Sequence, residues 1–139
     1  AGQASAVSDS ELSSCLVSNN TADVAAESGQ LDGCVVVENT GTGIFSAYVT
    51  NCVVARNAAL GVAGSSSFVV DCVVSNNLGG GVAGVTGLRC VIVDNVTSWN
   101  GGGARDATLT DCLLRGNIAG LSGGGASGSV GSVSTGPDS

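Results

Sequence analysis

The residues most able to do chemistry in this chain are six cysteines that recur at intervals of 18 to 22 residues. They are Cys15, Cys34, Cys52, Cys72, Cys90 and Cys112. Thiolates bind metals, attack electrophiles or pair as disulfides. We expect no metal site and no cofactor, because the chain has no histidine and its cysteines lack the close pairing of zinc sites. The regular spacing points to a structural role instead.

Six asparagines recur in step with the cysteines, each five residues after one. They are Asn20, Asn39, Asn57, Asn77, Asn95 and Asn117. An internal repeat of this length indicates a stacked solenoid. We expect these side chains to bond to one another as a ladder, at a corner where asparagine tolerates a left-handed backbone. A glycosylation alternative exists, because Asn19 and Asn95 begin Asn-x-Thr sequons.

Short apolar segments around each cysteine predict strands. Two apolar residues, mostly β-branched, follow every cysteine, and this favours a strand over a helix. A glycine corner and a further apolar residue come after each asparagine. No glycine-free stretch of ten or more residues has helical periodicity. We therefore expect residues 1–11 to form a leader or partial coil, 12–121 to form coils of three strands, and 122–139 to form a Gly/Ser-rich tail.

Two segments carry a family resemblance: GGGVAGVTGLRCVIVDN from Gly79 and GGGARDATLTDCLLRGN from Gly101. They resemble the β-helix repeats of large secreted bacterial surface proteins, whose pattern is Gly-Gly-Gly, then Thr-Leu-x-x-Cys-x-Leu-x-x-Asn. Pectate-lyase-like proteins and autotransporter passengers share that fold more loosely. The resemblance implies an all-β, single-stranded right-handed parallel β-helix (β-solenoid) of about six coils. It implies little about function, because this fold carries lyases, hydrolases and inert stalks.

The oxidation state of the cysteines is left open by the sequence. If all six occupy one position of the coil, neighbours lie about 4.8 Å apart, the spacing of paired strands. That is within the Cα separation of disulfides, roughly 4.4–6.8 Å. The alternatives are a buried stack of thiols or three bridges, Cys15–Cys34, Cys52–Cys72 and Cys90–Cys112. In either case each cysteine and the residue two later are expected to face the interior.

The charge and composition of the chain exclude some partners. The net charge is −7, lysine is absent, and the four basic residues are scattered arginines. Binding to nucleic acid needs a basic stripe, and an electrostatic membrane anchor needs a basic cluster. No apolar run approaches the roughly 18 residues of a membrane span. We expect no nucleic acid partner and no membrane insertion. Because no starting methionine or signal peptide is present, we expect a mature product or a piece of a longer protein.

Catalytic residues are not expected, although the fold hosts polysaccharide enzymes. The eleven carboxylates are spread along the chain, and histidine and lysine bases are absent. Asp71 and Asp111 lie two coils apart, which suits inverting glycoside hydrolysis, but Arg89 lies between them as a simpler partner. Arg56 is similarly placed beside Glu38. These alignments predict surface ion pairs.

An insertion after Asn95 is the sequence-based candidate for ligand contact. The longest interval between cysteines carries Val96-Thr97-Ser98-Trp99-Asn100. Insertions in solenoids lie at corners and often on the functional face. Trp99 and Asn100 are therefore candidate contacts, with Trp99 as a sugar-stacking platform. The alternative is that Trp99 covers the core.

Alternation along the strand predicts an apolar stripe on the surface. If each cysteine faces inward, the residue after it faces outward. These residues are Leu16, Val35, Val53, Val73, Val91 and Leu113. A soluble monomer rarely leaves such a stripe bare, so we expect a second chain or the tail, through Val130 and Val133, to cover it. Open strand edges at the ends add a head-to-tail route, and we expect a homo-oligomer or filament.

The sequence favours a non-catalytic, secreted or cell-surface module with a structural or adhesive role. This follows from the solenoid, the spread carboxylates and the predicted self-association. The alternative is a polysaccharide-binding or polysaccharide-cleaving domain, with a polysaccharide as partner. A third class, the ice-binding solenoids, fits less well because regular Thr-x-Thr rows are missing.

Overall fold

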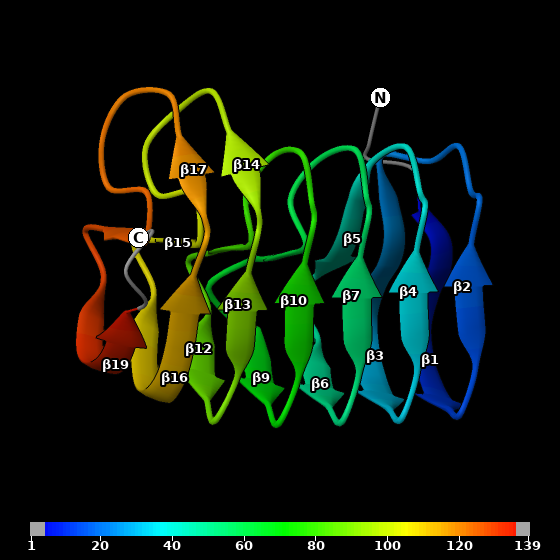
Figure 1. Cartoon of the computed structure of the whole chain (residues 1–139). Helices are drawn as coiled ribbons and strands as arrows, with labels where there is room; N and C mark the ends of the chain where they lie inside the picture. Colours follow the sequence, from blue (N-terminus) through cyan, green and yellow to red (C-terminus); the bar gives the residue numbers. More distant parts are fainter. Residues whose placement is uncertain (1–4, 136–139) are drawn as a thin grey trace.

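The protein is a right-handed parallel β-solenoid of about six coils. The computed structural model describes residues 5–135, and these contain no helix. Accordingly, the described residues include no helix long and apolar enough to cross a membrane. In Figure 1 the chain ascends the front strands, passes over the top and descends behind while advancing from right to left. Each coil has three faces, named below by the residues that characterise them.

The cysteine face is built from the strands that follow the cysteines. They are β2 (Leu16–Ser18), β4 (Val35–Val37), β7 (Val53–Ala55), β10 (Val73–Ser75), β13 (Val91–Val93) and the second half of β16 (Thr108–Arg115). Neighbouring strands pair parallel and in register, so that Val35, Val53 and Val73 lie side by side. They form the front row of Figure 1.

The other two faces complete each coil. The glycine face contains β5 (Thr42–Phe45), β8 (Val62–Ala63), β11 (Val82–Ala83), β15 (Ala104–Arg105) and β18 (Ala126–Ser127). The aromatic face contains β6 (Tyr48–Thr50), β9 (Phe68–Val70), β12 (Thr86–Leu88) and the first half of β16. The long strands β1 (Ser5–Ser13) and β3 (Val24–Asp32) span both of these faces, and they pair along their whole length. β14 (Val96–Thr97) and β17 (Ile118–Ala119) form a small separate sheet at a corner.

Strand pairing continues beyond Leu121. β18 pairs with β15, and β19 (Val130–Thr135) pairs with β16. The chain therefore goes on stacking coil upon coil at its C-terminal end. Residues 136–139 lie outside the described residues.

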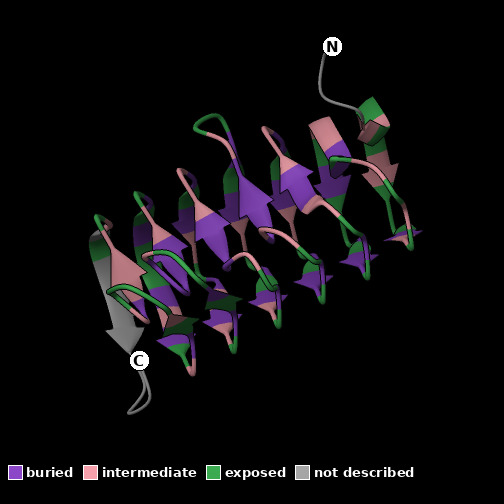
Figure 2. Ribbon diagram, turned by 90° about the horizontal axis from the view of Figure 1, so that it is seen from above, coloured by how far each residue is buried: buried purple, intermediate pink, exposed green. Residues whose placement is uncertain are grey.

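The interior is a set of stacked apolar rows, and Figure 2 shows buried residues recurring along the strands of successive coils. Each cysteine after Cys15 is at most 2% exposed, and Cys15 at the first coil is half-buried. The residue two after each cysteine is also buried, from Val17 to Leu114. The predicted inward direction of the cysteines is confirmed. Val, Leu, Ile and Ala fill the remainder of the core, in keeping with the low aromatic content.

The predicted asparagine ladder is present. Asn57 shows its geometry: Nδ2 and the backbone N–H both donate to Oδ1 of Asn77, each at 3.0 Å. The same amide also donates to the carbonyl of Val36 at 3.2 Å. Equivalent bonds run from Asn20 to Asn117. Among the described residues no buried side-chain nitrogen or oxygen lacks a hydrogen-bond partner. The ladder thus provides partners for amide groups that would otherwise be buried without a hydrogen bond.

The left-handed corner lies one residue before the ladder, and the prediction that placed it at the asparagines was wrong. Positive φ occurs four residues after each cysteine, as at Glu38 and Arg56, where φ is 59° and 54°. A second left-handed position comes just before each cysteine, as at Asp71 with φ of 53°. The ladder asparagines point inward and keep ordinary backbone angles, while their exposed neighbours make the turn.

A row of glycines on the glycine face leaves room for the ladder. A Cβ on Gly61 would lie 2.8 Å from Nδ2 of Asn77, 2.6 Å from Cγ1 of Val74 and 2.7 Å from the carbonyl oxygen of Gly81. Gly43 meets Asn57 in the same way on the preceding coil. Glycine at this position is thus explained by close approach of the opposite wall of the coil.

The six cysteines are free thiols, so the bridged alternative is not adopted in this structure. The backbone N–H groups of Cys34 and Cys52 donate to the sulfur of the following coil at 3.3 Å and 3.4 Å. Burial raises the pKa of Cys34. Contact with the thiol of Cys52, together with burial, raises the pKa of Cys72. Contact with Cys112 and burial raise the pKa of Cys90 in the same way, whereas the hydrogen bonds from Cys72 and Cys90 lower the pKa of Cys52 to about 7 and of Cys112 to about 6. Cys34, Cys72 and Cys90 are therefore protonated at neutral pH.

Candidate functional site

An exposed aromatic pair stands out on the aromatic face. Tyr48 and Phe68 are partners across β6 and β9, because each comes four residues before a cysteine. Their neighbours Val49 and Val69 face inward, so alternation turns both rings outward. The ring centroids are 5.1 Å apart and the planes differ by 8°. The two rings are thus stacked on each other, and Tyr48 is 54% exposed and Phe68 42%. Their edges and outer faces stay open to solvent, and we call the stacked pair the aromatic platform.

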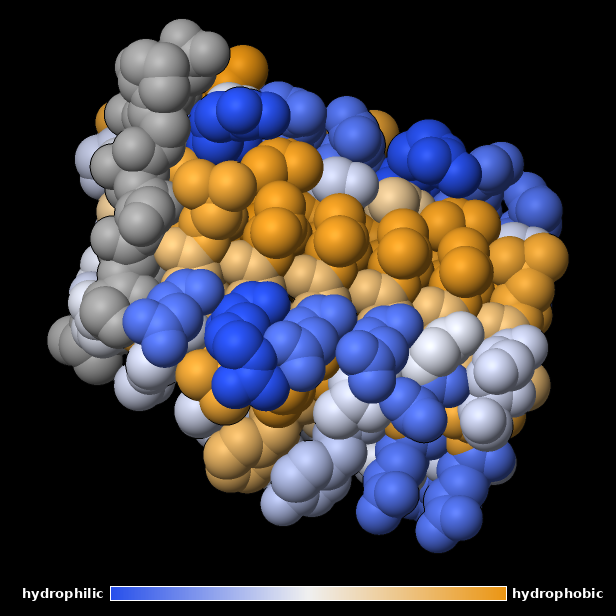
Figure 3. Space-filling model, turned by 60° about the horizontal axis from the view of Figure 1, so that its bottom comes forward, coloured by the Kyte–Doolittle hydropathy of each residue, from blue (hydrophilic) through white to orange (hydrophobic). Residues whose placement is uncertain are grey.

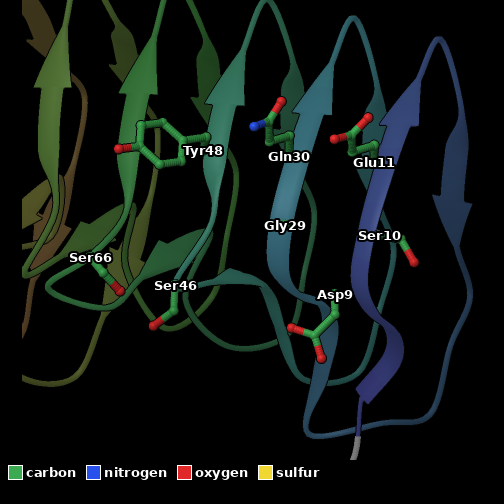
Figure 4. A pocket seen from close by; sticks show the side chains of 8 residues that line it. All are labelled: Asp9, Ser10, Glu11, Gly29, Gln30, Ser46, Tyr48 and Ser66. Carbon is green, nitrogen blue, oxygen red and sulfur yellow. The ribbon is translucent and has the colours of Figure 1, made fainter.

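An open hollow of about 420 Å³ lies beside this platform (Figure 4). Figure 4 shows Tyr48 and Gln30 on adjacent strands, with Glu11 on the next strand beyond. Strand register places Glu11, Gln30 and Tyr48 in one row across β1, β3 and β6. Asp9 and Ser46 lie at the far end of the hollow, near its corner. The hollow thus combines one aromatic ring with carboxylate, amide and hydroxyl groups.

A second hollow, of about 230 Å³, borders the other side of Tyr48. Its lining includes Gln30, Asp32 and Thr50. Asp32 is held in place because its Oδ1 accepts hydrogen bonds from the Thr50 hydroxyl at 2.9 Å and from Nδ2 of Asn51 at 3.3 Å. Tyr48 and Gln30 line both hollows. The two hollows form one polar strip with an apolar ring at its centre, and we call this strip the aromatic groove.

Trp99, the sequence-based candidate, lies in a different place. It is 65% exposed in the loop after β14 and does not cover the core. It lines an open hollow of about 360 Å³ together with Leu60, Leu78 and Arg105. Asn100 does not line this hollow, and its Oδ1 accepts a hydrogen bond from the hydroxyl of Ser122 at 2.9 Å. Of the two predicted contact residues, only Trp99 therefore lines this hollow, which lies outside the aromatic groove.

The charged groups aligned across coils form surface ion pairs. Arg89 donates to both carboxylate oxygens of Asp71, at 2.7 Å and 3.0 Å. Arg56 contacts Glu38 at 3.4 Å. The hydrogen bond from Arg89 lowers the pKa of Asp71. A general acid in glycoside hydrolysis needs the opposite shift, so Asp71 is poorly matched to that role. Over residues 5–135 no cluster of three or more His, Cys, Asp or Glu side chains could hold a metal ion.

Sequence reasoning missed the aromatic pair. Tyr48 and Phe68 are 20 residues apart, the same interval that separates Cys52 from Cys72. This equal interval could have predicted the pair, because two residues at the same distance from two successive cysteines lie side by side on adjacent coils. Chain order alone could not show that both rings are exposed.

No protein-family model, curated protein or solved structure matches this chain. The parallel β-solenoid is therefore established by its coordinates alone. The likeness to repeats of secreted bacterial surface proteins stays a resemblance in the Gly, Cys and Asn positions. Function has to be argued from the surface itself.

Proposed function

We propose that this protein is a non-catalytic adhesive module, secreted or displayed at the cell surface, that binds a polysaccharide along the aromatic groove. One observation carries the proposal: Tyr48 and Phe68 form an aligned, exposed aromatic pair beside hydrogen-bonding side chains. An extracellular setting is suggested by the resemblance to secreted surface proteins.

The groove has both kinds of group that a sugar needs. A pyranose ring has apolar patches of C–H groups and an edge of hydroxyls. Aromatic rings offer flat apolar surface, and Tyr48 adds a hydroxyl. Glu11, Gln30 and Asp32 offer acceptors, and the Gln30 amide also donates. Ligand sites generally combine apolar surface with a few placed polar groups in this way.

The groove is also rigid and long. Most of its side chains project from β1, β3 and β6, which are paired strands of one sheet, and Phe68 on the adjoining β9 stacks against Tyr48. Because these positions are held by the solenoid, binding orders little additional backbone. The strip runs across successive coils, which suits an extended chain better than a single sugar. A polysaccharide is therefore the ligand class that the shape favours.

The acidic residues favour binding over cleavage and select the type of sugar. Glycoside hydrolysis needs two carboxyl groups on opposite sides of the bond. Here Asp9, Glu11 and Asp32 all come from β1 and β3, on one side of Tyr48. The same carboxylates would repel uronic acids. We therefore expect neutral or amino sugars to bind and polyuronates to be rejected.

The experiment is a glycan array followed by titration of the best neutral or amino-sugar ligand. Tyr48→Ala should weaken binding at least about tenfold, and Tyr48→Phe should retain most of it, because the ring is the main contact. Trp99→Ala is the matched control, since it removes an exposed aromatic residue outside the groove. Wild-type binding by Tyr48→Ala would overturn the proposal, and a loss confined to Trp99→Ala would move the site to the insertion. New reducing ends from incubated glycan would contradict the non-catalytic role.

A further inference from the structure

A continuous apolar stripe runs along the cysteine face. It consists of Leu16, Val35, Val53, Val73, Val91 and Leu113, which are consecutive partners in strand register. Leu16 is 67% exposed, and the side chains of Val35, Val53 and Val73 are each about 40% exposed. Figure 3 shows this band crossing the molecule along the solenoid axis, with hydrophilic residues on both edges. The predicted stripe is present and is distinct from the aromatic groove.

The C-terminal segment does not cover this stripe. Strand β19 pairs with the edge of β16, and register places Ser134 beside Leu113. Through Thr135 the chain thus extends the cysteine face by a further coil and does not fold back over it. A contiguous apolar band with polar residues on both edges is typical of an interaction surface. A surface that covers the stripe would therefore come from outside the described part of this chain.

The two edges of the stripe carry charges in a definite order. The lower edge comprises the residues just before the cysteines, which are Ser14, Gly33, Asn51, Asp71, Arg89 and Asp111. The upper edge comprises the corner residues four after the cysteines, namely Asn19, Glu38, Arg56, Asn76, Asp94 and Gly116, together with Arg115. Both edges have left-handed backbone at all six coils, which keeps these side chains at the rim of the face.

We propose that the partner is a second copy of this chain, packed stripe against stripe with the two solenoid axes parallel. A twofold axis parallel to the solenoid then places each lower edge against the upper edge of the same coil in the partner copy. Arg89, which also holds Asp71 of its own chain, faces Asp94 on the fifth coil. Asp111 faces Arg115 on the sixth coil. Each contact occurs twice, so four opposite-charge pairs border the apolar centre.

The remaining coils are compatible with this arrangement. Asp71 faces Asn76, Arg56 faces Asn51, and the first two coils place Gly33 and Ser14 on the lower edge. No two like charges oppose each other. Reversing one copy end to end, with the stripes fully overlapped, would bring Glu38 against Asp94 instead. Charge complementarity therefore favours the parallel dimer, because like charges that face each other across an interface destabilise it. The exposed opposite-charge pairs add little affinity and mainly fix how the two copies align.

The first test is sedimentation equilibrium of the whole chain at micromolar concentration. The wild type should be a dimer, and Val73→Asp should raise the dimer dissociation constant at least about tenfold by facing two carboxylates across the axis. The control is Leu78→Asp, a change of the same kind at a 65% exposed residue on the same coil but off the stripe. It should leave dimerisation unchanged. A wild-type monomer, or equal effects of the two variants, would overturn the proposal.

The second test distinguishes the parallel from the reversed arrangement. Arg115→Glu should weaken the dimer because it opposes Asp111, whereas Arg105→Glu makes the same charge change on the glycine face and should not. In the parallel dimer Val35 faces its own copy, so Val35→Cys should cross-link to itself on mild oxidation. The wild type should stay unlinked, because five of its cysteines are buried and the half-buried Cys15 packs against the core. A dimer in which Val35→Cys fails to cross-link and Arg115→Glu has no effect would refute the parallel axis. Neither test depends on carbohydrate binding.

Discussion

At the scale of single residues, stability rests on polar groups that are buried and fully bonded. From Asn39 to Asn95, each ladder asparagine accepts two bonds from the preceding coil through its Oδ1 and donates its own amide to a backbone carbonyl and to the next coil. In the buried interior, each of these bonds also avoids the cost of an unpaired polar group. The ladder is thus a structural device.

Replacing one rung should therefore be severe. Asn57→Ala removes the acceptor for the backbone N–H and the Nδ2 of Asn39, at 3.1 Å and 2.9 Å. We expect a loss of about 2–4 kcal/mol in the free energy of unfolding, since the buried N–H of Asn39 loses its partner and the Nδ2 of Asn39 keeps only backbone carbonyls. Asn76→Gly is the control: it changes an exposed asparagine while keeping the left-handed corner accessible. Similar urea midpoints for the two variants would argue against a stabilising ladder.

The buried thiols make stability depend on alkaline pH. Contact with Cys112 and burial raise the pKa of Cys90, as contact with Cys52 and burial do for Cys72. Above the unfolded pKa of about 8.5 the unfolded chain loses these protons while the folded chain keeps them. The contribution of these two thiols is thus fully present below about pH 8.5 and is lost as the pH rises further, by up to about 1.4 kcal/mol per pH unit for each thiol. Their partners Cys112 and Cys52, whose pKa is lowered to about 6 and to about 7, add stability as the pH rises from those values to about 8.5.

Thermal unfolding under reducing conditions should record that fall between about pH 8.5 and pH 10. Thiol reactivity gives an independent reading: Cys15, which is half-buried, should react first in the native state, and six thiols should react after denaturation. A melting temperature that stays constant over this range, or rapid native-state modification of all six, would contradict the buried row.

At the scale of strands and corners, the coil is narrow enough for side-chain volume to be the limiting quantity. The glycine face approaches the ladder closely, and this explains why glycine recurs at Gly43 and Gly61. The corners instead require a left-handed backbone angle, and Asp, Asn, Glu and Arg residues adopt positive φ there. Side-chain volume therefore limits the sequence on the glycine face, and backbone angle limits it at the corners.

The Gly61→Ala substitution tests the volume argument. Its new methyl group would lie 2.6–2.8 Å from Val74, Gly81 and Asn77, so the wall of the coil has to shift, with a cost of about 1–3 kcal/mol. Gly33→Ala is the matched control because its nearest neighbour would be 3.7 Å away and only the left-handed φ of 63° opposes it. If chemical denaturation shows Gly33→Ala to be the more damaging change, close packing at Gly61 is not limiting.

Much of the fold could be predicted because its signals repeat. Cysteine and asparagine at matched offsets indicated the coils, the inward row and the ladder, since an error at one repeat is corrected by five others. The corner was misplaced because asparagine favours left-handed angles in general, whereas here Asn57 has to point inward and Arg56 makes the turn. The pairing of Tyr48 with Phe68 was not predicted because an aromatic residue occurs at this position in only two repeats. The exposure of the two rings also depends on which residues lie beside them in space.

At the scale of the whole molecule, the three faces have different chemical characters. The cysteine face carries the apolar stripe, the glycine face is built closely around the ladder, and the aromatic face carries the groove. A parallel dimer through the stripe would leave both grooves free with the same polarity along one axis. Two equivalent platforms on one particle would increase avidity for a repeating polysaccharide without new contacts.

The claim that the aromatic groove binds polysaccharide is tested most directly by mapping amide chemical shifts during titration with the best glycan of the array. We expect the largest chemical-shift changes at Tyr48 and Phe68, which form the platform, and at Gln30 and Thr50 beside it. Amides around Leu78, Trp99 and Arg105 should hardly move. Shifts centred on Trp99, or none at saturating neutral and amino-sugar glycans, would contradict the account.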